Sequence, residues 1–156
     1  SILVTTNNDG NYLTYVPNGW SGIVKPNNIN YLFNPDYYEI RNITENNTEL
    51  NFNSDKLPDG WGFETTYGSH TFCIIDNTFL NENVSINSWI GLFYLDSETN
   101  NEVCCGAIKY TGESSFCFNG YTKDIYTNIN GFSNNDSIIW KLFDIETNNI
   151  IDVVPN

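Results

Sequence analysis

The apolar residues of this chain come in short runs of four to seven, and nearly every run is bounded by Asn, Gly, Asp or Ser. Residues 89–95 and 137–144 are typical, because they are rich in Ile, Leu, Phe and Trp and each lies beside a polar turn sequence. Aromatic and β-branched residues favour strands, whereas Asn, Gly and Asp tolerate the backbone angles of tight turns. We therefore predict an all-β fold without helices, an antiparallel β-sandwich of Ig-like or jelly-roll-like form with short strands and Asn/Gly-rich turns.

Two parts of the chain are predicted. Residues 2–5 and 12–16 flank an Asp-Gly turn and predict a β-hairpin, so residues 1–57 are interpreted as an N-terminal hairpin or extension region. Residues 58–156 are predicted to form the β-sandwich domain, with the joint near residues 56–60. The N-terminal hairpin is apolar with little nearby to cover it, which makes its donation to a neighbouring subunit a further hypothesis.

Two short sequences occur twice. Pro-x-Gly-Trp ends at Trp20 and again at Trp61, and Leu-Phe followed by Glu-Thr-Asn-Asn occurs at residues 92–101 and at 142–149. Either the repeats mark two related β units or they reflect convergent turn chemistry in an Asn-rich chain.

The charge of the chain limits its partners. Six Lys and Arg residues oppose 19 Asp and Glu residues, which gives a formal net charge of −13. Such a chain lacks the basic surface that binds phosphate backbones, so nucleic acid is excluded as a partner. No apolar stretch has the length of a membrane span, and we predict no membrane insertion. An acidic, polar surface is typical of an exterior protein, and we expect an extracellular, virion or cell-surface location.

Catalytic motifs are missing from the sequence. His70 is the only histidine, and the sequence contains no nucleophile elbow, phosphate loop or His-Glu-x-x-His motif. We therefore predict that the chain is not an enzyme. A small glycosidase-type hydrolase is the third functional hypothesis, because paired carboxylates suffice for that reaction. The acidic residues considered for it lie near aromatic residues: Glu64, Asp76, Asp124 and Asp144.

Five aromatic residues lie in predicted turns or loops rather than in strands, and they are the predicted ligand-binding or partner-binding residues. Exposed aromatic rings stack on sugars and anchor protein interfaces, although the same residues are equally suited to closing the ends of a sandwich. These residues are Trp20, Trp61, Tyr67, Tyr121 and Tyr126.

Four cysteines allow three disulfide pairings, and free buried thiols are an equal alternative. If residues 110–113 form a turn, Cys105 and Cys117 lie across from each other and can form a cross-strand disulfide. No metal site is predicted and no cofactor is expected, since there is no Cys-x-x-Cys pair and only one histidine. Calcium is the alternative considered at residues 7–11 and 55–59, which offer oxygen ligands without the full loop spacing of a known site.

A resemblance to a known family is carried by residues 69–74, 89–94, 104–108, 130–132 and 137–144. Through these segments, the last 95 or so residues resemble a repeat domain of large secreted and surface proteins of marine Bacteroidetes, with similar stretches in virion proteins of marine viruses. The resemblance implies a non-catalytic β module, often one of several in tandem. The chain departs from the family pattern at residues 119–124, which replace an acidic loop, and at Phe143, which replaces a Trp.

The leading functional hypothesis is thus a non-catalytic structural or adhesive β module on a virion, filament or cell surface. It would act through contacts with partner proteins or with copies of itself. The alternative is a carbohydrate-binding module that holds surface glycans with its loop aromatics.

Overall fold

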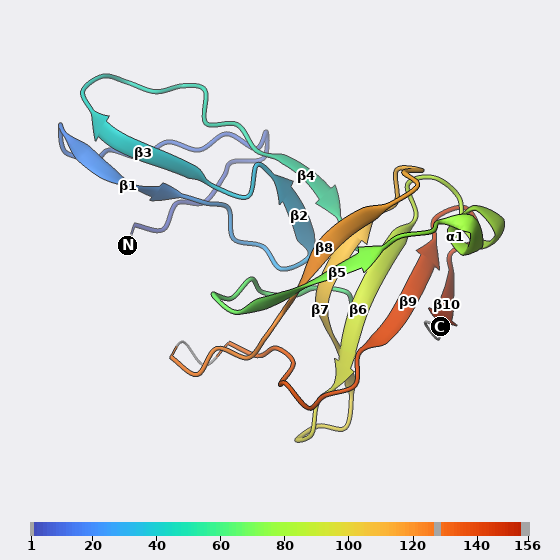
Figure 1. The fold of residues 1–156 in the computed structure, drawn as a ribbon. Helices are drawn as coiled ribbons and strands as arrows, with labels where there is room; N and C mark the ends of the chain where they lie inside the picture. The colour runs from blue at the N-terminus through green and yellow to red at the C-terminus, as the bar shows by residue number, and fades with distance from the viewer. Residues whose placement is uncertain (1, 127–128, 154–156) are drawn as a thin grey trace. The chain divides into compact units, whose positions relative to one another are not determined.

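The computed structural model describes residues 2–126 and 129–153. Its contacts divide the chain into two compact units, of which unit 1 contains residues 1–27 and 33–54 and unit 2 contains residues 28–32 and 55–156. The described residues form ten strands and one short helix (Figure 1). The elements are β1 (Trp20–Val24), β2 (Tyr31–Asn34), β3 (Tyr38–Ile43), β4 (Asn53–Lys56), β5 (Ser69–Ile74), α1 (Thr78–Asn83), β6 (Trp89–Leu95), β7 (Glu102–Lys109), β8 (Phe116–Tyr121), β9 (Ile139–Asp144) and β10 (Asn149–Val153).

Unit 1 has little regular structure. Strands β1 and β3 pair antiparallel as a two-stranded sheet, and β2 and β4 form another two-stranded sheet. The chain passes from one unit to the other within β2 and within β4. The predicted hairpin of residues 2–16 is wrong, because the Asn7–Gly10 turn forms but no strand flanks it. No residue among the described residues of unit 1 is buried.

Unit 2 is built on a four-stranded antiparallel sheet with the order β10-β9-β6-β7. Strands β5 and β8 pair as a separate two-stranded ribbon, which lies across one face of this sheet (Figure 1). Phe72 of β5 and Phe118 of β8 both meet Trp140 of β9 edge to face, with ring centroids 5.8 and 5.9 Å apart. The predicted all-β, sandwich-like fold is therefore confirmed.

The central strand β6 is buried on both faces. Ile90, Leu92 and Tyr94 belong to the core beneath the β5–β8 ribbon, whereas Trp89 and Phe93 belong to a second core on the opposite face. Alternate residues of a strand point to opposite faces, so this near-continuous apolar run serves both cores. The second core is completed by residues before β5, namely Leu32, Leu57, Trp61 and Phe63.

One helix departs from the prediction. Helix α1 occupies Thr78–Asn83, although the sequence predicts a fold without helices. Asp76 accepts hydrogen bonds from the Thr78 amide and hydroxyl at the start of the helix, and Leu80 is its buried residue. A helix of six residues that buries one side chain is too short to show an apolar periodicity in the sequence.

The repeated sequences form repeated turns. In Pro-x-Gly-Trp, the amide of Trp20 bonds to Pro17 O and that of Trp61 to Pro58 O, each at 3.0 Å, and the preceding glycines have φ of +80° and +81°. In the second repeat, Asp96 accepts bonds from the amide and hydroxyl of Thr99, and Asp144 does the same with Thr147. Asn100 and Asn148 follow with φ of 56° and 55°. Local turn chemistry therefore accounts for both repeats.

The disulfide joins Cys73 to Cys117, so the predicted Cys105–Cys117 pair is wrong. Strand β8 pairs with β5 rather than with the preceding strand β7, and this register sets Cys73 directly opposite Cys117 with Cα atoms 4.1 Å apart. Cys104 and Cys105 are free and buried, one in each core. Burial raises the pKa of both thiols to about 12.

Candidate functional site

The structure separates the five predicted aromatic residues. The prediction of Trp61 as a ligand-binding residue is wrong, because only 2% of this residue is exposed and it packs in the second core of unit 2. Trp20 is half-buried at the start of β1 in unit 1. Tyr121 is half-buried and stacks on Phe63, with ring centroids 5.8 Å apart. Tyr67 and Tyr126 are almost fully exposed, at 98% and 91%.

Hydrogen bonds hold the loop of Tyr67 against the end of β8. The Thr122 amide donates to Gly68 O at 3.0 Å, and the Thr66 hydroxyl lies within hydrogen-bond distance of Gly68 O and Thr122 O. A Cβ at Gly68 would meet the Thr122 hydroxyl, so a larger residue at this position would require that side chain to rotate. The backbone on both sides of Tyr67 is fixed while its ring stays in solvent.

Tyr126 lies in the next loop, which begins after β8 and returns at Phe132. The amide of Lys123 donates to Phe132 O and that of Asp124 to Ile129 O, both at 3.0 Å. The Asp124 carboxylate also accepts a bond from the Tyr126 amide. This loop therefore presents Ile125 and Tyr126 to solvent. Tyr67 and Tyr126 lie on two loops that are joined by hydrogen bonds at Thr122, and Tyr121 is the last residue of β8 beside them.

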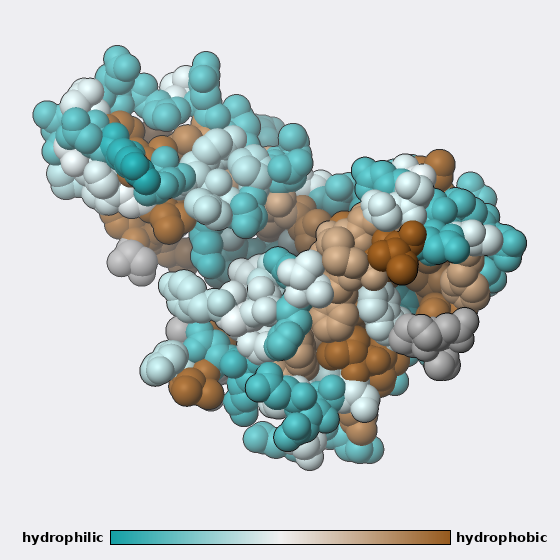
Figure 2. Space-filling view, viewed as in Figure 1, coloured by the Kyte–Doolittle hydropathy of each residue, from teal (hydrophilic) through white to brown (hydrophobic). Residues whose placement is uncertain are grey.

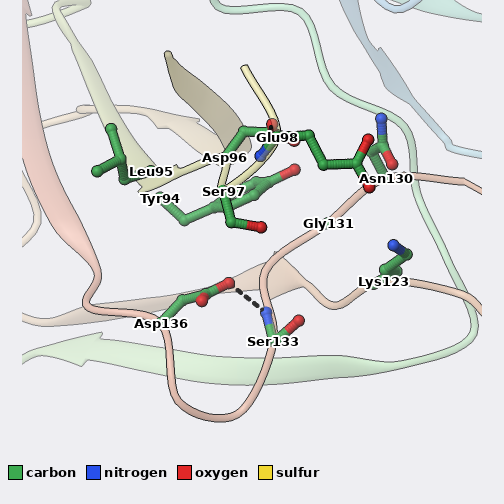
Figure 3. Close-up of a pocket in the computed structure, with 10 residues that line it drawn as sticks. All are labelled: Tyr94, Leu95, Asp96, Ser97, Glu98, Lys123, Asn130, Gly131, Ser133 and Asp136. Carbon is green, nitrogen blue, oxygen red and sulfur yellow. Dashed lines mark hydrogen bonds between the residues drawn. The ribbon is translucent and has the colours of Figure 1, made fainter. Parts of the chain in front are cut away.

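The same loop forms one wall of a polar hollow of about 60 Å³ (Figure 3). Tyr94, at the end of β6, is 4% exposed and lies at the base of the hollow. Figure 3 shows the Tyr94 hydroxyl directed toward the side where Glu98 and Asn130 lie, whereas Leu95 points away. The sequence does not single out Tyr94, because this residue lies within an apolar run that predicts a buried strand.

The charges around the hollow are mixed. Hydrogen bonds from Thr99 lower the pKa of Asp96, with a smaller contribution from Lys123. Asp136 accepts a 2.7 Å hydrogen bond from the Ser133 amide. Desolvation, and then the negative charge of Asp96, raise the pKa of Tyr94 to about 12, so its phenol is protonated at neutral pH. The hollow thus offers carboxylate acceptors, an ammonium group and a neutral hydroxyl.

The two predicted calcium-binding segments have other contacts. The Asn7 side chain accepts bonds from the amides of Asp9 and Asn11, which closes a turn. Asp55 pairs with Lys109 at 2.6 Å, and Asp59 pairs with Lys56 at 3.0 Å. Within the part of the chain that the structure describes, no three His, Cys, Asp or Glu residues are placed to hold a metal ion.

Asp144 is one of the carboxylates considered for glycoside hydrolysis, and its hydrogen bonds indicate a structural role. It is 6% exposed and accepts bonds from the amides of Ser85 and Thr147 and from the hydroxyls of Ser88 and Thr147. These bonds, of which that from the Thr147 hydroxyl contributes most, place the pKa of Asp144 far below its ordinary value of 3.8. A general acid needs a raised pKa, so Asp144 does not suit that role.

The lowered pKa of Asp144 predicts that the folded state of unit 2 loses stability in acid. Below pH 3.8, Asp144 takes up a proton in the unfolded chain while it stays ionised in the folded chain, so stability falls with decreasing pH. We expect the thermal midpoint of unit 2 to decline below about pH 4. Asp144→Asn should lower the midpoint at pH 7 and flatten this decline. Parallel pH curves for the two proteins, measured by circular dichroism, would contradict the assignment.

In comparisons with known proteins, no family model, curated protein or solved structure matches the chain. The resemblance of residues 61–156 to a marine repeat domain therefore stays a prediction. Across residues 2–126 and 129–153, the structure contains no helix with the length and hydropathy needed to cross a bilayer.

Proposed function

We propose that this chain is a non-catalytic structural or adhesive β module that acts through protein–protein contacts on an extracellular, virion or cell surface. The observation that carries the proposal is the composition of the unit 1 surface. None of its described residues is buried, and seven of its large apolar side chains are exposed. They are Ile2, Leu3, Val4, Leu13, Tyr15, Ile23 and Tyr37. Figure 2 shows such hydrophobic atoms at the surface between hydrophilic ones.

The physical argument is that unit 1 lacks a core. Ordering a residue costs about 1–2 kcal/mol of backbone entropy, and burial of apolar side chains is the main term that offsets this cost. Leu3 is 87% exposed and Leu13 is 72% exposed, so neither contributes such burial within the chain. Contact with another protein surface would bury these two side chains. Strands β1 and β3 also form a sheet of only two strands, whose outer edges suit the addition of a further strand.

An exterior location fits the disulfide. Cys73 and Cys117 lie on the exposed face of the β5–β8 ribbon, where a reducing compartment would give thiols access to the bond. Disulfides of this kind persist in oxidising surroundings, outside the cell or on a virion surface.

Light scattering across a range of salt concentrations tests the proposal. Each copy carries a formal net charge of −13, so copies repel at low salt, and screening removes that repulsion as the Debye length falls to about 8 Å at 0.15 M. We expect a defined assembly larger than the 17.8 kDa monomer that grows stronger with added salt. Contacts made by ion pairs would weaken instead.

The double substitution Leu3→Ser and Leu13→Ser should dissociate this assembly. Ile75→Ser is the matched control, because Ile75 is equally exposed, at 87%, but belongs to unit 2. A wild-type protein that stays monomeric at every salt concentration would contradict self-assembly. Equal loss of assembly in the double variant and in the control would contradict the role of unit 1.

Glycan binding is the second candidate function, and one observation favours it. Tyr67 and Tyr126 lie fully exposed on two loops that hydrogen bonds hold together, which is how a rigid stacking platform for sugars is built. This candidate does not involve the exposed apolar residues of unit 1, since Tyr67 and Tyr126 belong to unit 2.

A further inference from the structure

A buried tyrosine, Tyr94, presents its hydroxyl to the hollow beside β6. Only 4% of Tyr94 is exposed, and its hydroxyl forms no hydrogen bond with any of the described residues. The hydroxyl nevertheless reaches the hollow and is directed into it (Figure 3). A donor that opens onto a hollow and has no protein partner can bond there to water or to a hydroxyl of a ligand.

The groups around this hydroxyl come from three parts of the fold that are separate in sequence. Asp96 and Glu98 lie in the turn after β6, Lys123 and Asn130 lie in the loop after β8, and Asp136 precedes β9. Asp96 and Asp136 are each fixed by hydrogen bonds to main-chain amides, so their carboxylates are held in place before any ligand arrives. Glu98, Lys123 and Asn130 are exposed at the rim.

We propose that this hollow binds the hydroxyl-bearing edge of one sugar ring, with the Tyr94 hydroxyl as its central donor. Each sugar hydroxyl can donate to a carboxylate and accept from Tyr94 or Lys123 at the same time. A metal ion would leave the Tyr94 proton without an acceptor, and an ammonium group only donates hydrogen bonds. A polyhydroxylated ligand therefore matches the mixture of groups better than a cation does.

The volume of the hollow limits which part of a sugar can enter it. A hollow of about 60 Å³ admits a few groups the size of a water molecule, which corresponds to the hydroxyls along one ring edge rather than to a whole ring. The remainder of the sugar lies outside the hollow, above the exposed rim. This inference rests on the second candidate function, glycan binding, and is independent of the assembly role.

The test is a titration of isotope-labelled protein with neutral monosaccharides, followed by amide chemical shifts. The probes are glucose, galactose, mannose, fucose and N-acetylglucosamine. We expect at least one to shift the amides of residues 94–98 and 130–136. Tyr94→Phe removes only the hydroxyl and should weaken this binding about tenfold, in keeping with the loss of one hydrogen bond. Tyr15→Phe, on the exposed surface of unit 1, should bind as the wild type does.

Stability separates a binding role from a structural one. A hydroxyl kept for folding would reduce the thermal midpoint when removed, whereas an unpartnered one should leave the midpoint unchanged or raise it in Tyr94→Phe. Asp136→Asn is the second variant, because it keeps an oxygen for the Ser133 amide but loses the charge, and it should also weaken sugar binding.

Several results would overturn the inference. One such result is that sugars shift only the amides of the loops that hold Tyr67 and Tyr126, while Tyr94→Phe binds sugar as the wild type does. In that case glycan binding stands and the proposed site at Tyr94 is wrong. If calcium chloride or lysine amide shifts residues 94–98 and no sugar does, the hollow is a cation site instead. If no sugar binds, this site and the glycan candidate both fail, and light scattering still decides the assembly role.

Discussion

Replacement of Trp61 by alanine is expected to lower the free energy of unfolding of unit 2 by about 3–5 kcal/mol. Trp61 is 2% exposed and meets Phe93 and Phe143 edge to face, with ring centroids 5.1 and 6.3 Å apart. Its ring also packs on Gly91, where a Cβ would come within 2.5 Å of the indole. An alanine leaves a cavity that the surrounding strands cannot close, because β6 is held by β7 and β9 on its two sides.

Urea denaturation followed by circular dichroism measures this effect, and Trp20→Ala is the matched control. Trp20 follows the same Pro-x-Gly turn but lies half-buried in unit 1, so its removal should leave the main unfolding transition of unit 2 unchanged. If Trp61→Ala unfolds like the wild type and loses ligand binding, Trp61 would be a binding residue after all and its assignment to the core would be wrong.

The contrast between these two tryptophans shows which part of the fold can be predicted from the sequence. The turn is a local property, fixed by Pro, a glycine at φ near +80° and the bond back to the proline carbonyl, and both copies form it. Whether the following tryptophan is covered depends on residues distant in sequence. Trp61 is covered because β6 and β9 place Phe93 and Phe143 against it, and no local pattern contains that information.

The same distinction explains the disulfide and the candidate site. Cys117 was predicted to face a strand that precedes it directly, but β8 pairs with the more distant β5. A return to the preceding strand is the local expectation, and the ribbon of a sandwich violates it. Tyr94 was missed for a related reason, since its position in an apolar strand indicates burial while its hydroxyl function appears only when three separate segments surround it.

Loss of the Cys73–Cys117 disulfide is expected to have the second large effect, a decrease of about 4 kcal/mol in the free energy of unfolding, for a bond that spans 44 residues. Unfolding with the bond intact leaves a closed loop that has lost much of its freedom, and reduction restores that freedom to the unfolded chain. Both cysteines lie on the exposed face of the β5–β8 ribbon, so Cys73→Ser with Cys117→Ser creates no cavity and buries no hydroxyl. The expected change therefore reports the cross-link itself.

Reductant and thiol labelling supply the controls. Reductant should destabilise the wild type to the level of the double variant and have no further effect on that variant. Cys104 and Cys105 remain as internal reporters, because burial and pKa values near 12 keep them from reacting in the folded protein. A thiol reagent should therefore label neither until unit 2 unfolds. If reduced and oxidised wild type unfold at the same urea concentration, the ribbon is held by packing of Phe72 and Phe118 on Trp140, and the cross-link contributes nothing to stability.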